Sequence, residues 1–263
     1  MRVIRVAGLC LAGVLVSFSI IASSAQAAPA LGQCVKDPDK GKFEDKGCTK
    51  RATQPKQAKF EFESLKEELK YESLTEETKL TAIIKGQPLE LECKSSKDNG
   101  EFLVGGNRDK DIVIFKGCEL KPFGVTCQTA TRANGEIVSD LLNSNFLGAG
   151  EKGNGGLKAP AAGEIWLQYE PVANHPFAEW ECAGVKGELT GSISGKIPSK
   201  YIGTPLKVGK KTNKGDKPSF TAVFEATAGE QALKVTTEGE TVAANFDGTS
   251  DINLFNKGED FEP

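Results

Sequence analysis

Hydrophobic and polar residues alternate along much of the chain after residue 78, as in β-strands that bury one face. The segments 79–84 and 88–93 alternate on either side of Lys85-Gly86-Gln87, and this arrangement predicts a β-hairpin. Many short strands separated by turns favour a sandwich or a barrel. The other expected strands, separated by turns rich in glycine and asparagine, are 101–104, 111–115, 124–128, 164–169, 178–182, 188–194, 219–226, 233–237 and 241–245.

Two stretches carry mixed signals. Phe62, Leu65 and Leu69 follow helical spacing, whereas Phe60 and Phe62 alternate as in a strand, so we predict a strand that leads into a short helix over 60–77. The stretch 134–147 is expected to hold a strand and a helical turn. The predicted fold class is therefore all-β, an antiparallel sandwich or barrel of short strands that admits one short helix.

Residues 1–27 have the three-part pattern of a secretory signal peptide. Arg2 and Arg5 form a basic region, residues 6–21 are apolar, and Ala25-Gln26-Ala27 is a small-residue cleavage site. The apolar stretch is shorter than the roughly 20 residues that a transmembrane helix needs. We therefore expect cleavage after Ala27, no membrane span in the mature chain, and a protein that is secreted or held in the cell envelope.

The mature chain is expected to have two parts. A polar N-terminal segment, 28–56, contains Cys34 and Cys48 on either side of a turn-rich stretch, so a disulfide would close it. The remainder, 57–263, is long enough to bury a substantial core as one β domain or as two lobes.

Six cysteines remain after Cys10 is removed with the signal peptide, and an even number in an exported chain indicates disulfides. Closeness in sequence pairs Cys118 with Cys127 across a bend at Pro122 and Gly124, which leaves Cys93 for Cys182. The expected bridges are Cys34–Cys48, Cys118–Cys127 and Cys93–Cys182. With one histidine and no C-x-x-C spacing, no metal site is expected.

A repeated pattern supports the Cys93–Cys182 pairing. The segment 89–93 reads Leu-Glu-Leu-Glu-Cys and the segment 178–182 reads Ala-Glu-Trp-Glu-Cys. Because side chains alternate across a strand, each segment would point its cysteine inward and its glutamates towards solvent. Trp180 is therefore expected in the core, near a bridge between the two strands.

The charge distribution argues against nucleic acid as a partner. The chain has 33 basic and 36 acidic residues, and removal of the signal peptide makes it slightly more acidic. Basic and acidic residues are interspersed, whereas phosphate binding needs concentrated lysine and arginine. The lysines between 207 and 217 lie among glycine, asparagine and threonine, and they indicate a solvated loop.

The sequence offers little for catalysis or for cofactor binding. His175 is the single histidine and precedes a proline, so we expect a loop residue rather than a catalytic base. The run 148–153 matches G-x-G-x-x-G, but no helix is expected after it, so no dinucleotide cofactor is expected. Glu179 and Glu181 could serve a carboxylate-based hydrolase, although a solvated strand face explains them more simply.

Aromatic residues are densest between 166 and 180. Trp166 falls on the opposite strand face from Ile165, Leu167 and Tyr169, so it is the candidate exposed platform for a ligand such as a sugar. Trp166 and Tyr169 are therefore the candidate ligand-binding residues, with core packing as the alternative.

With these features in hand, the chain resembles a family of exported actinobacterial proteins of uncharacterised activity. The resemblance implies export and paired cysteines, and it implies no activity. The residues that carry it are Cys34-Val35-Lys36, Gly41-Lys42-Phe43-Glu44-Asp45, Cys48, Leu91-Glu92-Cys93, Phe115-Lys116-Gly117-Cys118, Cys127, Gly135-Glu136-Ile137, Phe177, Cys182 and Gly187.

The function expected from the sequence is that of a non-catalytic binding or interaction module of the cell envelope or the extracellular space, with an envelope polymer, a glycan or a protein as ligand. One alternative is a secreted hydrolase that uses carboxylates. A second is a β-barrel carrier of a lipid or small molecule, which would need an apolar cavity. A third is an inhibitor or interaction protein, which would present a rigid exposed loop such as 118–127.

Overall fold

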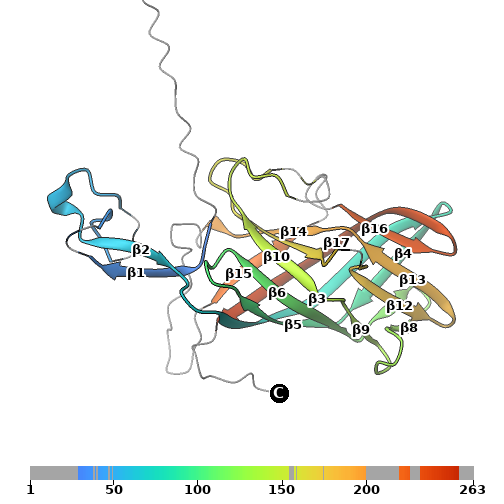
Figure 1. The fold of residues 1–263 in the computed structure, drawn as a ribbon. Coiled ribbons are helices and arrows are strands. Elements are labelled where there is room, and N and C mark those ends of the chain that lie inside the picture. The colour runs from blue at the N-terminus through green and yellow to red at the C-terminus, as the bar shows by residue number, and fades with distance from the viewer. Residues whose placement is uncertain are drawn as a thin grey trace, which may run out of the picture.

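A computed structural model describes residues 29–37, 39, 41–46, 48, 50–153, 157, 159–173, 175–199, 219–225 and 232–254. The expected signal peptide and the lysine-rich stretch 207–217 lie outside these residues. The described chain is all-β and antiparallel, as the sequence predicts, with a 15-stranded main sheet and a separate two-stranded sheet (Figure 1).

The strands of the main sheet have the following bounds: β3 (Leu69–Ile84), β4 (Gln87–Cys93), β5 (Ser95–Phe102), β6 (Arg108–Lys116), β7 (Glu119–Lys121), β8 (Val125–Gln128), β9 (Glu136–Val138), β10 (Leu142–Leu147), β11 (Trp166–Pro171), β12 (Ala178–Cys182), β13 (Val185–Thr190), β14 (Ile193–Lys196), β15 (Ser219–Phe224), β16 (Leu233–Thr237) and β17 (Glu240–Leu254). The small sheet contains β1 (Gly32–Lys36) and β2 (Phe60–Ser64), and the short 3-10 helix η1 (Pro55–Gln57) precedes β2.

The main sheet closes into two rings that share β3 and β17. The proximal ring runs β3-β5-β6-β10-β11-β14-β15-β17, and the distal ring runs β3-β4-β7-β8-β12-β13-β16-β17. β3 has 16 residues and β17 has 15, which is a length of about 50 Å at the usual rise per residue. These two strands pair with each other along both rings, and a register shift between Gly248 and Ser250 lies where one ring passes into the other.

The small lobe projects from the proximal end of the body (Figure 1). It combines β1, β2 and the Cys34–Cys48 disulfide, so it extends past the segment 28–56 into residues 60–64. Backbone hydrogen bonds anchor it: the Leu31 amide donates to the Gly106 carbonyl at 2.7 Å, and the Gly105 amide donates to the Leu65 carbonyl at 2.9 Å.

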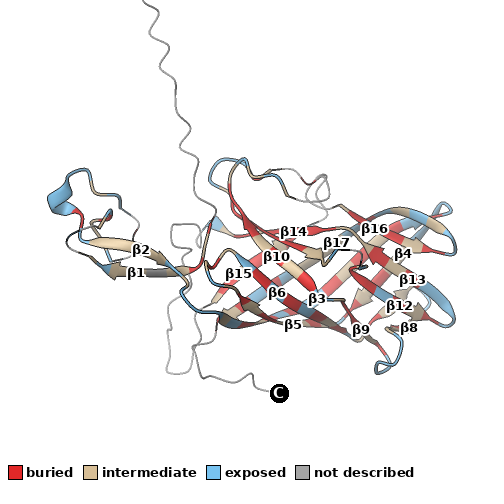
Figure 2. Cartoon of the chain, in the orientation of Figure 1, coloured by how far each residue is buried: buried red, intermediate tan, exposed pale blue. Residues whose placement is uncertain are grey.

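Burial alternates along the strands of the body (Figure 2). Along β6, for example, Asp109, Asp111, Val113 and Phe115 are buried while the residues between them are exposed or half-buried. The buried side chains of both rings form one continuous hydrophobic cluster, which is the core of the body. The described residues include no helix with the length and apolar character that a bilayer crossing requires.

Three expectations about local structure were wrong. Residues 60–77 contain no helix: they form β2 and the start of β3, because β3 bonds to β5 and β17 on its two sides and this pairing overrides the helical spacing of three apolar residues. Residues 134–147 contain β9 and β10 with no helical turn. The expected strand 188–194 is broken at Gly191, whose backbone is left-handed and approaches Ala232 too closely to admit a side chain.

The expected hairpin at Lys85-Gly86 is confirmed, and it belongs to a set. Three two-residue turns, Lys85-Gly86, Ala183-Gly184 and Glu238-Gly239, have positive φ at both residues and therefore match the type I′ geometry that suits twisted antiparallel strands. All three connect strands of the distal ring.

The disulfide pattern corrects the sequence prediction. Cys34–Cys48 is confirmed, but Cys93 bonds to Cys118 and Cys127 bonds to Cys182. The order β4-β7-β8-β12 puts Cys93 beside Cys118 and Cys127 opposite Cys182. Cys93 and Cys182 are three strand spacings apart, about 14 Å, and a disulfide spans less than about 7 Å between Cα atoms.

Candidate functional site

An open groove of about 440 Å³ crosses the outer wall of the distal ring, over β12, β13 and β16. Glu179, Glu181 and Glu188 line it from the outward positions of β12 and β13, and Trp180 and Gly187 contribute to its floor. Trp180 is buried, as the sequence predicts, and its indole lies against Gly187, the residue directly opposite in the ladder. Because Gly187 has no side chain, the strand backbone there is close to the indole.

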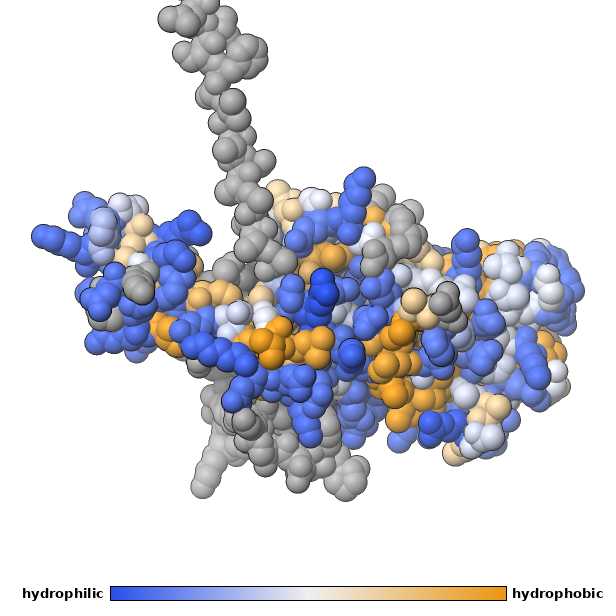
Figure 3. All heavy atoms as spheres, viewed as in Figure 1, coloured by the Kyte–Doolittle hydropathy of each residue, from blue (hydrophilic) through white to orange (hydrophobic). Residues whose placement is uncertain are grey.

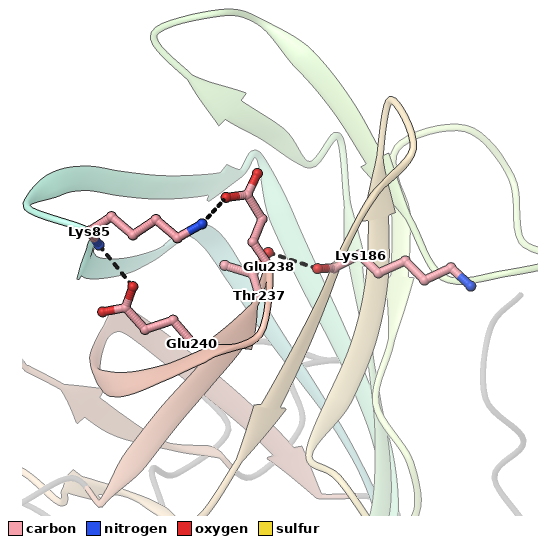
Figure 4. A network of polar contacts seen from close by, with 5 residues as sticks. All are labelled: Lys85, Lys186, Thr237, Glu238 and Glu240. Carbon is pink, nitrogen blue, oxygen red and sulfur yellow. Dashed lines mark hydrogen bonds and ion pairs between the residues drawn. The ribbon is translucent and has the colours of Figure 1, made fainter.

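The distal end of the groove is bounded by the β16–β17 turn. Figure 4 shows Lys85 reaching across to this turn: its Nζ lies 2.9 Å from Glu238, and its backbone amide donates to Glu240 at 3.2 Å. The Thr237 hydroxyl donates to the Lys186 carbonyl at 2.8 Å, while the Lys186 side chain extends away from Lys85, Glu238 and Glu240 (Figure 4). These bonds join the turns of β3–β4 and β16–β17 to β13, so this end of the groove is held in place.

The groove has an excess of negative charge. Four glutamates and one lysine line it, and Glu179 lies directly opposite Glu188 in the β12–β13 ladder. Like charges directly opposite each other destabilise a sheet. Within the part of the chain that the structure describes, neither Glu179 nor Glu188 has an ion-pair partner.

The repeated pattern on β4 provides a contrast. Leu91 and Cys93 point inward like Trp180 and Cys182, as predicted. On the outer face, however, Glu90 pairs with Lys79 at 2.7 Å and Glu92 lies 3.7 Å from Lys121. The same local sequence thus presents ion-paired glutamates on β4. On β12, Glu179 lies opposite Glu188, and Glu181 lies opposite Lys186 without an ion pair among the described residues.

The candidate ligand-binding residues Trp166 and Tyr169 are both buried, and the prediction of an exposed platform was wrong. Trp166 does lie on the opposite face of β11 from Tyr169, but its exposed fraction is 3%. The β10–β11 connection folds back against this face: a Cβ at Gly153 would lie 3.1 Å from the Gln168 side chain. Tyr169 points into the proximal ring, where its hydroxyl contacts Asp98.

The other residues considered for catalysis do not come together. His175 Nδ1 lies 3.2 Å from Asp140 Oδ2, and both side chains are exposed. The adjacent Ser139 hydroxyl is buried; it accepts from the Val113 amide at 2.9 Å and donates to the Asp140 carbonyl at 2.8 Å, so it is held by the backbone rather than by His175. Among the described residues, no three acidic, histidine or cysteine side chains are arranged to hold a metal ion.

A buried polar cluster inside the proximal ring was missed by the sequence reasoning. Asp98, Asp109 and Asp111 are fully buried, together with Tyr71 and Tyr169. The signal was present, because Asp109 and Asp111 fall in phase with the inward-facing Val113 and Phe115 of β6. The interior around this cluster is filled: the cavities there and in the distal ring are about 30 Å³ each.

Hydrophobic side chains gather in separate patches on an otherwise hydrophilic surface (Figure 3). Among the residues that the structure describes, the most exposed large hydrophobic side chain is Phe123, at 77%, on the turn between β7 and β8. The Cys93–Cys118 and Cys127–Cys182 disulfides fasten this hairpin to its neighbours on both sides. No protein-family model, curated protein or solved structure matches the chain.

Proposed function

We propose that this protein is an exported, non-catalytic binding module of the cell envelope or extracellular space, and that its ligand is an extended, positively charged chain held in the groove over β12, β13 and β16. The observation that carries the proposal is the unneutralised Glu179–Glu188 pair, placed face to face on the wall of a 440 Å³ groove. A ligand with amino groups would relieve the repulsion between these carboxylates.

The covalent framework supports this assignment. Two disulfides tie the walls of the distal ring together, and such bonds persist outside the reducing cytoplasm. A rigid wall also lowers the entropic cost of binding, because little ordering is needed when the ligand arrives. The resemblance to exported proteins with paired cysteines points the same way.

Two alternatives, a carrier of a small molecule and a carboxylate hydrolase, have less support. A carrier needs a pocket of about 300–1,000 Å³, and each interior cavity near the buried cluster or in the distal ring holds about 30 Å³. A carboxylate hydrolase needs an acid whose pKa is raised and which its substrate can reach. Among the described residues, the carboxyls with raised pKa are Asp98, Asp109 and Asp111, and all three are buried inside the proximal ring.

Two probes of matched length and different charge test the proposal. Oxidised mature protein is titrated with glucosamine oligomers that have free amino groups and with the same oligomers after N-acetylation, and it is co-sedimented with purified cell-wall sacculi. We expect binding to the free-amine oligomers that weakens as salt increases, and little binding to the acetylated ones.

The repeated pattern supplies the matched control. Glu179→Gln/Glu181→Gln should reduce binding at least tenfold, whereas Glu90→Gln/Glu92→Gln removes the same two charges on β4 and should leave binding unchanged. Equal binding by both double variants, or equal affinity for both oligomers, would refute the groove as the site.

One observation favours a second candidate, an interaction protein that uses the β7–β8 hairpin. Phe123 is almost fully exposed on a turn whose two flanking strands are each fixed by a disulfide. Exposed aromatic anchors on rigid loops are typical of protein interfaces. If Phe123→Ala abolishes attachment to sacculi that still contain their proteins and Glu179→Gln/Glu181→Gln does not, this candidate replaces the groove.

A further inference from the structure

Three aspartates lie inside the proximal ring, at the opposite end of the body from the groove. Asp98 on β5 and Asp109 and Asp111 on β6 have exposed fractions of 3%, 1% and 2%. Carboxylates are rarely buried without a cation, because removing a charge from water costs several kcal/mol. The cluster therefore needs another means of neutralisation.

Hydroxyl groups supply most hydrogen bonds of the cluster, and the Ser144 backbone adds one to Asp109. The Tyr71 hydroxyl lies 2.8 Å from Asp111 Oδ2 and 3.4 Å from Asp98 Oδ2. The Tyr169 hydroxyl donates to Asp98 Oδ2 at 3.3 Å, and the Ser144 hydroxyl donates to Asp109 Oδ1. One oxygen on each aspartate has no hydrogen-bond partner among the described residues.

These donors are too few for three carboxylates. Tyr71, Tyr169 and Ser144 each have a single hydroxyl hydrogen, whereas three ionised aspartates present six acceptor oxygens. A protonated carboxyl supplies a donor of its own, so protons would both remove charge and complete the network.

The strands packed around the cluster present hydroxyl groups to it and no compensating positive charge among the described residues. Tyr71 and two hydroxyl residues face it from β3, Ser144 from β10, Tyr169 from β11 and Ser250 from β17. The charged residues of β5 and β6 that neighbour the aspartates, Lys97, Arg108 and Lys110, occupy outward positions. Among the described residues, the titratable groups that face the cluster are thus the aspartates themselves and the two tyrosines.

The electrostatics agree with this geometry. Burial raises the pKa of Asp98 and of Asp111 well above the ordinary value, and the neighbouring carboxylates raise it further. Burial raises the pKa of Asp109 to about 6, although the Ser144 and Tyr71 hydroxyls oppose this change.

We propose that Asp98, Asp109 and Asp111 form a proton-dependent lock inside the proximal ring. When the carboxyls are protonated, their hydrogen bonds join β5 and β6 to β3, β10 and β11. When they lose protons, like charges accumulate in a sealed interior and weaken the attachment of β5 and β6. The lock is independent of the groove, and its contribution to stability is largest in acidic surroundings.

The direction of the pH dependence follows from linkage. An unfolded aspartate loses its proton near pH 4, whereas the folded carboxyls keep theirs to higher pH, so unfolding releases protons above pH 4. The contribution of these carboxyls to stability is therefore greatest below about pH 4, and it falls as pH rises towards their folded-state pKa values. For a chain of this size, the melting temperature should fall by roughly 3–5 °C per pH unit for each carboxyl that is protonated only in the folded state.

The experiment is thermal unfolding of the oxidised mature protein from pH 4 to pH 9. We expect the melting temperature of the wild type to fall across this range and that of Asp98→Asn/Asp109→Asn/Asp111→Asn to fall much less. The control Asp251→Asn removes an exposed carboxylate that accepts from Thr221, and its curve should run parallel to the wild type. Parallel curves for all three proteins would overturn the proposal.

A further measurement keeps the test decisive if the triple variant does not fold. Infrared spectra of the folded wild type at pH 7 should contain the band of protonated carboxyl groups, and this band should vanish on unfolding. Its absence from the folded protein would refute the lock.

Discussion

Tyr71 and Gly100 lie directly opposite each other in the β3–β5 ladder, and the tyrosine ring occupies the space that a side chain at position 100 would need. A Cβ at Gly100 would lie 2.5 Å from the Tyr71 hydroxyl oxygen. The glycine therefore allows the hydroxyl to reach Asp98 on β5 and Asp111 on β6. Trp180 and Gly187 repeat this relationship in the distal ring.

Gly100→Ala should destabilise the protein by about 1–3 kcal/mol, because the added methyl group displaces a fully buried ring. Denaturant unfolding measures the change. The neighbouring variant Glu101→Ala alters the outer face of the same strand and should stay within about 0.5 kcal/mol of the wild type. A Gly100→Ala protein as stable as the wild type would contradict the packing of Tyr71 described above.

Tyr71→Phe should cost about 1–3 kcal/mol at neutral pH, since it removes a donor from a buried carboxyl. Tyr169→Phe should cost less, because its hydroxyl is 3.3 Å from Asp98 whereas that of Tyr71 is 2.8 Å from Asp111. The Tyr71 hydroxyl lowers the pKa of Asp98 and Asp111, so its loss raises these pKa values further.

The sign of the pH effect in Tyr71→Phe follows from that change. A higher folded-state pKa extends to higher pH the range in which unfolding releases protons. The unfolding free energy of the variant should therefore continue to fall at pH values where that of the wild type has levelled. Curves that level at the same pH would show that Tyr71 does not act on the carboxyls.

Removal of the Cys127–Cys182 disulfide by Cys127→Ala/Cys182→Ala should cost about 4 kcal/mol, because this bridge closes a loop of 55 residues. Loss of Cys34–Cys48 should leave the melting of the body almost unchanged, since that bridge lies within the small lobe. Calorimetry of both double variants makes the comparison. Peptide mapping without reduction should also recover Cys93 linked to Cys118, and a Cys93–Cys182 peptide would contradict the strand order.

Ala183→Asn should stabilise the protein by about 0.5–1 kcal/mol. Ala183 has a φ of 49° in the β12–β13 turn, a conformation that costs most residues energy and that asparagine tolerates. The control Ala133→Asn places asparagine in a loop position outside the positive-φ set and should have little effect. An unfolding midpoint for Ala183→Asn at or below that of the wild type would disprove the turn assignment.

The sequence by itself determined the all-β class, the position of several strands and the inward face of those strands. Alternation over 178–182 and 233–237 predicted strands whose bounds the structure reproduces, and Leu91, Cys93, Trp180 and Cys182 face the core as expected. These properties are local, because one strand face must be buried wherever a sheet covers a core. The turn at Lys85-Gly86 was predictable for the same reason.

Only the tertiary structure decided which strands are neighbours, and the errors in the disulfide pairing and in the exposure of Trp166 follow from that. Strand order placed β7 and β8 between β4 and β12, so Cys93 and Cys182 each found a nearer partner. A returning loop covered Trp166, and ring closure gathered Asp98, Asp109 and Asp111 from two strands around Tyr71. Side-chain alternation specifies a face of the strand, but the pairing energy that selects the partner depends on residues far away in the chain.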